Sequence, residues 1–196
     1  MTTFELLTTY FEDELSQISN DYIKEFVFQC FDKFCPEYFW IVPASTSGKY
    51  HPKESLGEQG LIRHVKKTVY FGIELWKSLY NGIDITTKDL IIACLLLHDI
   101  IKNGNAKFEN NNWIKEENST ENHGWLLAEK IKKDIFNGYF RKNYHKYIYY
   151  GIACHMGKWT GNPKFYIENI PLFYRKFAEL VHLADYIASR NVPVFI

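Results

Sequence analysis

Histidine and aspartate side chains placed next to or inside apolar stretches are the residues of this sequence best suited to chemistry. The pair His98-Asp99 directly follows residues 91–97, an apolar run that belongs in a hydrophobic core. Burying an imidazole and a carboxylate at the end of such a run is costly unless another group compensates them. A metal ion is the natural compensation, because direct coordination replaces the lost water. A pair that simply emerges at a helix end is the alternative interpretation.

Four further residues of the same two kinds share this setting, each in a hydrophobic stretch with helical spacing. They are His64, His123, His155 and Asp185. Residues contributed by several helices can converge inside a bundle, which is where helical proteins usually build metal sites. Nitrogen and oxygen donors without thiolate suit iron, manganese, cobalt, nickel or magnesium better than structural zinc. The six residues therefore predict a metal centre.

The segments that must position these residues repeat their apolar side chains every three to four positions, which is typical of amphipathic helices. We expect helices near residues 4–18, 22–34, 58–80, 87–97, 120–136, 144–155 and 171–189. The polar residues 43–52 and the asparagine-rich residues 102–118 are expected to be loops, and no segment has a convincing strand pattern. The sequence thus predicts an all-α protein with one helical domain.

Local signals place the ends of two of these helices. Asn81-Gly82 is expected to end the third helix in the left-handed conformation. Thr86 or Thr87 is expected to cap the next helix, with Asp89 complementing the dipole in its first turn.

Composition excludes several classes of protein. Lys plus Arg and Asp plus Glu both number 23, so the formal net charge is zero, which argues against a broad footprint on duplex DNA. The four cysteines form no CxxC pair and are expected to be free thiols in a reducing compartment. The first residues lack the features of a signal peptide, and the longest apolar run is too short to cross a bilayer. We therefore expect a cytoplasmic protein without a membrane partner.

The order His, His-Asp, His, His, Asp resembles the HD-domain superfamily. The signature of that family is written His-Asp-x-Gly-Lys, and this chain reads His98-Asp99-Ile100-Ile101-Lys102, with Ile101 in place of the usual glycine. The resemblance extends over roughly residues 57–190. It implies a single-domain helical bundle of the HD type, in which residues 57–196 form the metal-binding core and residues 1–56 supply N-terminal helices and a polar loop packed on it.

The resemblance also implies an activity. His64, His98, Asp99 and Asp185 match the core ligands of the family, and His123 and His155 match the positions that binuclear members use for a second metal. Two divalent ions (Mn, Fe, Co, Ni or Mg) bridged by Asp99 would then supply a hydroxide that attacks phosphorus, while Lys102 offers positive charge to the phosphate. The implied enzyme is a phosphohydrolase, and the two additional histidines favour a phosphodiesterase. Its substrate would be a nucleotide, a cyclic nucleotide or a short single-stranded oligonucleotide.

Two segments near the ligands are candidates for substrate contacts. Lys49 and His51 lie in the polar loop before the first ligand, and Lys158 and Trp159 follow His155. An exposed tryptophan can stack on a nucleobase. A polar surface turn and a tryptophan packed beneath its loop are the alternatives. We expect His182 to support the site structurally, because it lies three residues before Asp185, and we expect His145 to lie on the surface.

Three other functional classes remain open. Di-iron oxygenases of the HD type share the six-residue order. A nucleotidase or a deoxynucleotide triphosphohydrolase would use the same fold, typically with a mononuclear centre. A non-catalytic nucleotide-binding module is the third, although the presence of all six residues counts against it.

Overall fold

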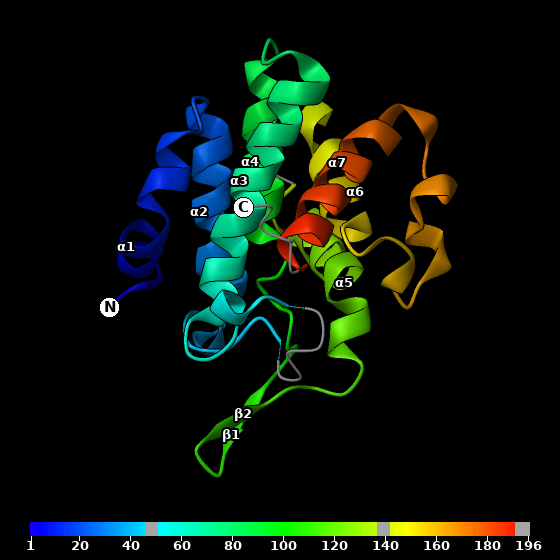
Figure 1. Cartoon of the computed structure of the whole chain (residues 1–196). Helices are drawn as coiled ribbons and strands as arrows, with labels where there is room; N and C mark the ends of the chain where they lie inside the picture. Colours follow the sequence, from blue (N-terminus) through cyan, green and yellow to red (C-terminus); the bar gives the residue numbers. More distant parts are fainter. Residues whose placement is uncertain (46–50, 137–141, 191–196) are drawn as a thin grey trace, which may run out of the picture.

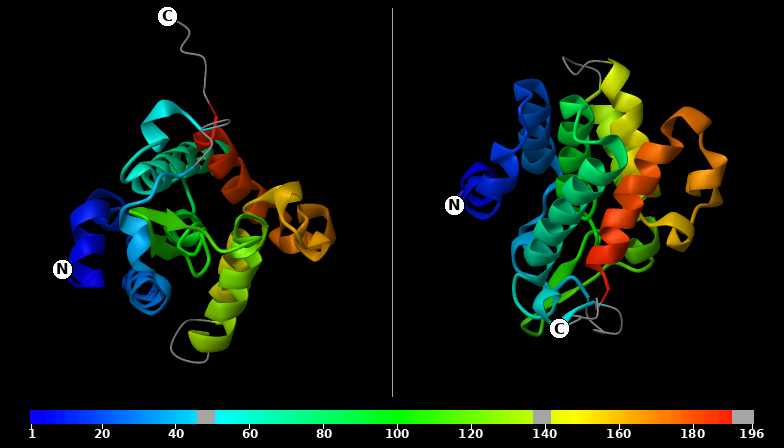
Figure 2. Two further views of the ribbon diagram at one scale, coloured as in Figure 1. Left: turned by 90° about the horizontal axis from the view of Figure 1, so that it is seen from below. Right: turned by 45° about the horizontal axis from the view of Figure 1, so that its top comes forward.

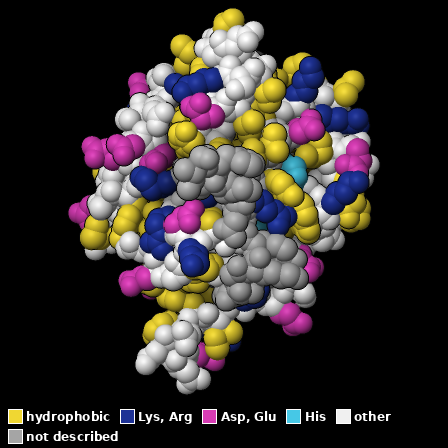
Figure 3. All heavy atoms as spheres, in the orientation of Figure 1, with side chains coloured by type: hydrophobic (Ala, Val, Ile, Leu, Met, Phe, Trp, Pro, Cys, Tyr) yellow, Lys and Arg dark blue, Asp and Glu magenta, His cyan; other side chains and the backbone are white. Residues whose placement is uncertain are grey.

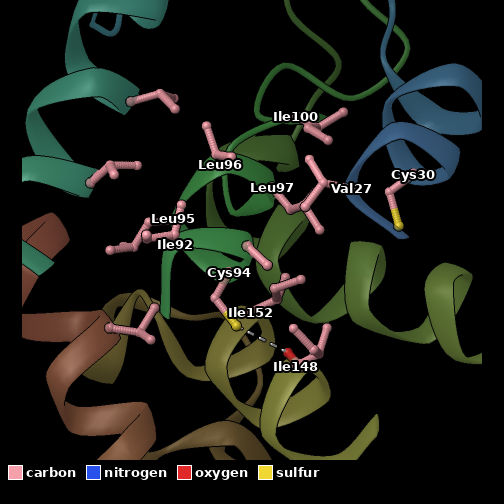
Figure 4. Packing of buried hydrophobic residues seen from close by; sticks show 14 of the residues in the cluster. Val27, Cys30, Ile92, Cys94, Leu95, Leu96, Leu97, Ile100, Ile148 and Ile152 are labelled. Carbon is pink, nitrogen blue, oxygen red and sulfur yellow. Dashed lines mark hydrogen bonds between the residues drawn. The ribbon is translucent and has the colours of Figure 1, made fainter. Parts of the chain in front are cut away.

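The most apolar segment of the chain forms the central helix, α4 (Ile85–Leu97), in which every residue from Asp89 onward is buried. A helix that is hydrophobic on all sides needs neighbours on all sides. In the computed structural model, α4 packs against α2 (Asp21–Phe34), α3 (Gly60–Tyr80), α6 (Lys142–Cys154) and α7 (Leu172–Ala188). Figure 4 shows the side chains of α4 between those of its neighbours, with Cys94 Sγ 3.9 Å from the carbonyl oxygen of Ile148.

The remaining helices surround this centre (Figure 1). The structure describes residues 1–45, 51–136 and 142–190. Helix α5 (Ser119–Asp134) packs on α6, and α3 packs along α7. Helix α1 (Thr3–Ser16) pairs with α2 at the outer edge of the bundle, which Figure 2 shows from two further directions. The short 3-10 helices are η1 (Glu37–Trp40), η2 (Lys53–Ser55), η3 (Gly157–Trp159), η4 (Pro163–Phe165) and η5 (Ile167–Asn169).

The described residues thus form one all-α domain, as predicted, with one exception. The segment expected to be a loop contains a two-stranded antiparallel hairpin of β1 (Lys107–Glu109) and β2 (Asn112–Ile114). Asn110 and Asn111, both at positive φ, form its turn. Each strand has only three residues, and five of these six residues are exposed, so the segment is too short and too exposed for a strand pattern to mark it in the sequence. The hairpin projects from the bundle (Figure 1).

Helix ends follow local chemistry in most places. The left-handed end of α3 is confirmed, with Asn81 at φ 53° and Gly82 at φ 67°. The predicted cap of α4 was wrong: the carboxylate of Asp84 accepts the Thr87 N–H at 3.1 Å, so the helix begins two or three residues earlier. Asp89 lies beyond the first turn, where its Oδ2 accepts two backbone N–H groups from the connection between α1 and α2.

The free thiols match the expectation from composition, and charged side chains of both signs share the face drawn in Figure 3. In the face seen in Figure 3, basic and acidic side chains are interspersed, with no broad patch of one sign. All four cysteines are free, and burial raises the pKa of the Cys30 and Cys94 thiols well above its ordinary value. Among the described residues, no helix combines the length and the apolar character needed to cross a membrane.

Candidate metal centre

The six predicted residues meet at one end of the bundle. His64 lies in the second turn of α3 and His123 in the second turn of α5, so both are near helix starts. His98 and Asp99 follow the end of α4, His155 follows α6, and Asp185 lies in the last turn of α7. Helices α3 and α5 run opposite to α4, α6 and α7, so the starts of the first two meet the ends of the other three (Figure 1). Five of the six residues are buried, and the side chain of Asp185 is 19% exposed.

The two carboxylate oxygens of Asp99 face two different sets of imidazoles. Its Oδ2 lies 3.5 Å from the Nε2 atoms of both His64 and His98. Its Oδ1 lies 2.8 Å from Nε2 of His123 and 3.7 Å from Nε2 of His155. We call His64, His98, Asp99 and Asp185 the first ligand group, and Asp99, His123 and His155 the second. One carboxylate is therefore shared by both groups.

Asp185 completes the first ligand group from α7. Its Oδ1 lies 3.1 Å from Nε2 of His64 and 3.8 Å from Nε2 of His98. Despite this proximity, both of these Nε2 atoms are buried without a hydrogen-bond partner in the described part of the protein. Buried polar atoms in proteins are rarely left unpaired. The Nε2 atoms of His64 and His98 both lie near the carboxylate oxygens of Asp99 and Asp185, which is the arrangement that a cation between these atoms would require.

Backbone carbonyls fix the imidazoles so that Nε2 faces the centre. The Nδ1 atoms of His98, His123 and His155 lie 2.6, 3.0 and 2.7 Å from the carbonyl oxygens three residues earlier. Nδ1 must donate in each of these hydrogen bonds, which leaves the lone pair of a neutral ring on Nε2. His123 and His155 then direct two lone pairs at each other across 3.0 Å. Such a contact is repulsive unless a cation or a proton lies between the nitrogens.

The charges of the site suit a cation as well. Burial raises the pKa of the Asp99 carboxyl, but Lys102, His98 and His123 lower it more, so the pKa lies well below its ordinary value. Burial also lowers the pKa of His155 to about 3, with His123 and His98 adding to the effect. Burial lowers the pKa of His98 too. At neutral pH the site therefore offers the ionised Asp99 carboxylate and the neutral imidazoles of His98 and His155, which are the forms that bind metals. These buried groups can hold a metal ion.

Lys102 is held against the centre by the turn that follows Asp99. Its Nζ lies 2.7 Å from Asp99 Oδ2. The turn is built from successive backbone hydrogen bonds in which an N–H donates to the carbonyl three residues earlier. It needs a positive φ only at Gly104 (φ 59°). Ile101 keeps a negative φ, so this chain does not need the glycine that the HD signature has there. The hydroxyl of Tyr38 holds the turn by donating to the Gly104 carbonyl and accepting the Asn103 N–H.

A cavity of about 450 Å³ opens over the centre and is lined by four of the six residues, Asp99, His123, His155 and Asp185. Its outer wall is aromatic. Trp159 is 58% exposed and stacks on Tyr186 with 5.7 Å between ring centroids, and the Arg190 guanidinium lies 4.5 Å from the Tyr186 ring centroid. A neighbouring cavity of about 510 Å³ shares only His123 with the centre. The smaller cavity is therefore the candidate substrate site.

The four predicted substrate contacts have different positions. Trp159 and His51 line the cavity, and burial lowers the pKa of His51 to about 4, with Lys102 and His64 adding to the effect. The ammonium of Lys158 lies 3.6 Å from Glu168, and Lys158 is not among the lining residues. Lys49 lies outside the described residues.

Two residues of the cavity wall, Tyr186 and Ser189, were not assigned a role from the sequence. They line the cavity together with His182 and Asp185. Their spacing of three to four residues is that of one helix face, so the face of Asp185 on α7 was a signal that could have found them. His182 supports the centre as expected, because its Nδ1 lies 2.6 Å from the His155 carbonyl oxygen.

Compared with family models, curated proteins and solved structures, the chain matches none. The resemblance to HD domains therefore rests on the six residues, their order and their helical setting.

Proposed function

We propose that this protein is a metal-dependent phosphohydrolase of the HD-domain type, and specifically a phosphodiesterase for a nucleotide-like substrate. One observation carries the proposal. Asp99 directs one carboxylate oxygen to each of two imidazole groups at the base of a cavity that also holds a lysine. A carboxylate in this position can bridge two cations, and paired cations are typical of enzymes that cleave phosphate esters.

The donor atoms define the cofactor that we propose. The first ligand group offers two imidazoles and two carboxylates, and the second offers two imidazoles and the shared carboxylate. Nitrogen and oxygen donors of this kind suit Mn, Fe, Co, Ni or Mg. When bound, two such cations supply Lewis acidity toward the phosphoryl oxygens and lower the pKa of water.

The residues of the chain then have distinct roles. Lys102 reaches both Asp99 and the cavity, so its ammonium can compensate negative charge on a phosphate. His51 lines the same cavity, and its buried Nε2 has no hydrogen-bond partner in the described part of the protein. This nitrogen can therefore contact the substrate. The exposed ring of Trp159 can stack on a nucleobase. The proposed substrate thus has its phosphate at the centre and its base at the outer wall.

The test combines metal analysis with a substrate panel. Purified protein is assayed for bound transition metals and then for hydrolysis of bis-p-nitrophenyl phosphate, mononucleotides, deoxynucleoside triphosphates, cyclic nucleotides and short RNA and DNA strands. We expect close to two metal ions per chain and cleavage of a phosphodiester. Preference for mononucleotides or triphosphates would favour the nucleotidase alternatives. Protein that carries no metal and cannot be loaded with manganese or iron would contradict the proposal.

Asp99→Ala is the decisive variant, because it removes a ligand from both groups. We expect it to lose hydrolysis and most bound metal. Asp13→Ala, at an exposed position of α1, is the matched control and should retain both. Wild-type turnover by Asp99→Ala would remove the central assignment. Repeating the assay without oxygen separates hydrolysis, which should persist, from the oxygenase alternative, which should stop.

A further inference from the structure

The segment from His155 to Gly161 links the end of α6, at His155, to the first turn of α5, near His123. It begins at His155 itself and carries Trp159 in η3. At its other end the N–H of Gly161 donates to the carbonyl oxygen of Glu121 at 2.8 Å. Glu121 lies two residues before His123 on α5. The segment, which we call the η3 strap, is therefore anchored beside both ligands that α5 and α6 contribute.

His182 clamps the beginning of this strap. Its Nδ1 donates to the His155 carbonyl at 2.6 Å. Its ring also packs against Gly157, where an added Cβ would come within 2.7 Å of the imidazole. Gly157 has φ 58°, a conformation that glycine adopts more readily than other residues. The position of the His182 ring thus fixes both the backbone of a ligand residue and the turn that follows it.

The strap also joins the ligands to the cavity wall. The Trp159 N–H donates to the Met156 carbonyl at 3.2 Å, within the turn that His182 holds. The Trp159 ring stacks on Tyr186 and lies 6.1 Å from the His182 ring. If Trp159 shifts on contact with an aromatic group, the backbone of the η3 strap must therefore move with it. That backbone is hydrogen-bonded at His155 at one end and to Glu121, near His123, at the other.

We propose that His182 is a positioning residue that, through the η3 strap, couples the second cation to the aromatic subsite at Trp159. This inference rests on the cation pair of the proposed function. It gives the two metal positions different properties: the second depends on the strap, and the first, held by α3, α4 and α7, does not. Coupling between two sites is reciprocal, so a ligand at Trp159 must change the affinity of the second cation, and that cation must change the affinity of the ligand by the same factor.

The experiment measures binding rather than turnover. The full chain is titrated with Mn²⁺, and its two affinities are determined for the wild type, His182→Ala and His182→Asn. The Asn side chain can present an N–H where Nδ1 donates now. Loss of a group that orients a metal ligand typically costs 10–100-fold in affinity. We expect His182→Ala to weaken the second cation at least tenfold and the first less than twofold, and His182→Asn to restore most of the loss.

Two further measurements test the coupling itself. The emission change that Trp159 contributes is obtained by comparison with Trp159→Phe. It should accompany Mn²⁺ binding at the second ligand group and vanish in His182→Ala. Adenosine, as an aromatic probe without phosphate, should change only the second Mn²⁺ affinity. His145→Ala is the matched control, because that ring stacks on Phe136, a residue outside the metal centre and the cavity that opens over it.

Different failures have different meanings. Equal Mn²⁺ affinities in His182→Ala and wild type would overturn the inference, as would a loss that His182→Asn does not restore, or a wild type that binds fewer than two cations. Two coupled cations in a protein that hydrolyses no phosphate ester would support the inference while contradicting the proposed function.

Discussion

Acid should destabilise the metal-free protein through His155, and the size of the effect follows from its burial. The pKa of His155 is lowered to about 3 from 6.5, first by burial and then by His123 and His98. Above pH 6.5 this ring is neutral in both the folded and the unfolded state, so it contributes no pH dependence to the free energy of unfolding. Below pH 6.5 the unfolded chain binds a proton that the folded protein excludes, and the free energy of unfolding falls by about 1.4 kcal/mol per pH unit. Between pH 7.5 and 5, this ring alone should remove about 2 kcal/mol.

The assay is urea unfolding in the presence of a chelator at pH 7.5, 6.5, 5.5 and 5. The variant His155→Asn removes the titrating ring, so its loss of stability between pH 7.5 and 5 should be smaller than that of the wild type by about 2 kcal/mol. The comparison uses the dependence on pH, because Asn also loses packing and therefore lowers stability at every pH. Parallel curves for the two proteins would refute the reasoning, since they would mean that His155 is protonated equally in the folded and unfolded states.

Three further substitutions have defined outcomes. Gly157→Ala forces a side chain into a left-handed backbone and against His182, so scanning calorimetry should show a Tm lower by roughly 2–8 °C, and an unchanged Tm would contradict the described turn. Asp89→Ala removes a buried carboxylate that accepts two backbone N–H groups, and urea unfolding should show a loss of about 3 kcal/mol, whereas a loss below about 1 kcal/mol would mean that water replaces it. Trp159→Ala should weaken equilibrium binding of a purine mononucleotide by roughly tenfold, and an unaltered affinity would remove Trp159 from the substrate site.

The helices could be predicted from the sequence because their apolar faces are continuous. All seven expected helices are present, with ends within a few residues of those expected. The errors arose where a tertiary contact or solvent decided the structure. Asp89 was assigned to a helix dipole, but it binds the backbone of a segment about 70 residues away in the chain. The hairpin at residues 107–114 is mostly exposed on both faces, so the sequence carries no burial pattern there.

The candidate site was predictable to a different extent in its two parts. The six candidate ligand residues were evident because ionisable side chains in apolar helical stretches require an explanation. The rest of the cavity wall beyond Trp159 and His51 was not evident, since Tyr186 and Arg190 are ordinary residues at the end of a helix until α7 is placed against η3. The position of Asp99 between the two ligand groups is also a feature of the tertiary structure. Its two oxygens face different groups because α3 and α5 approach it from different sides, which spacing along the chain does not specify.

The length of α3 gives this protein a place for engineering. His64 lies near the start of the helix, and the turn at Asn81 and Gly82 lies after its end at Tyr80. Tyr80 lies sixteen positions after His64 on the same helix, which is about 24 Å at 1.5 Å per residue. The turn is short, both of its residues have positive φ, and neither belongs to the cavity over the metal centre. A fluorophore or an affinity tag inserted into this turn should leave metal loading undisturbed, which provides a handle for immobilising the protein with the candidate site facing solution.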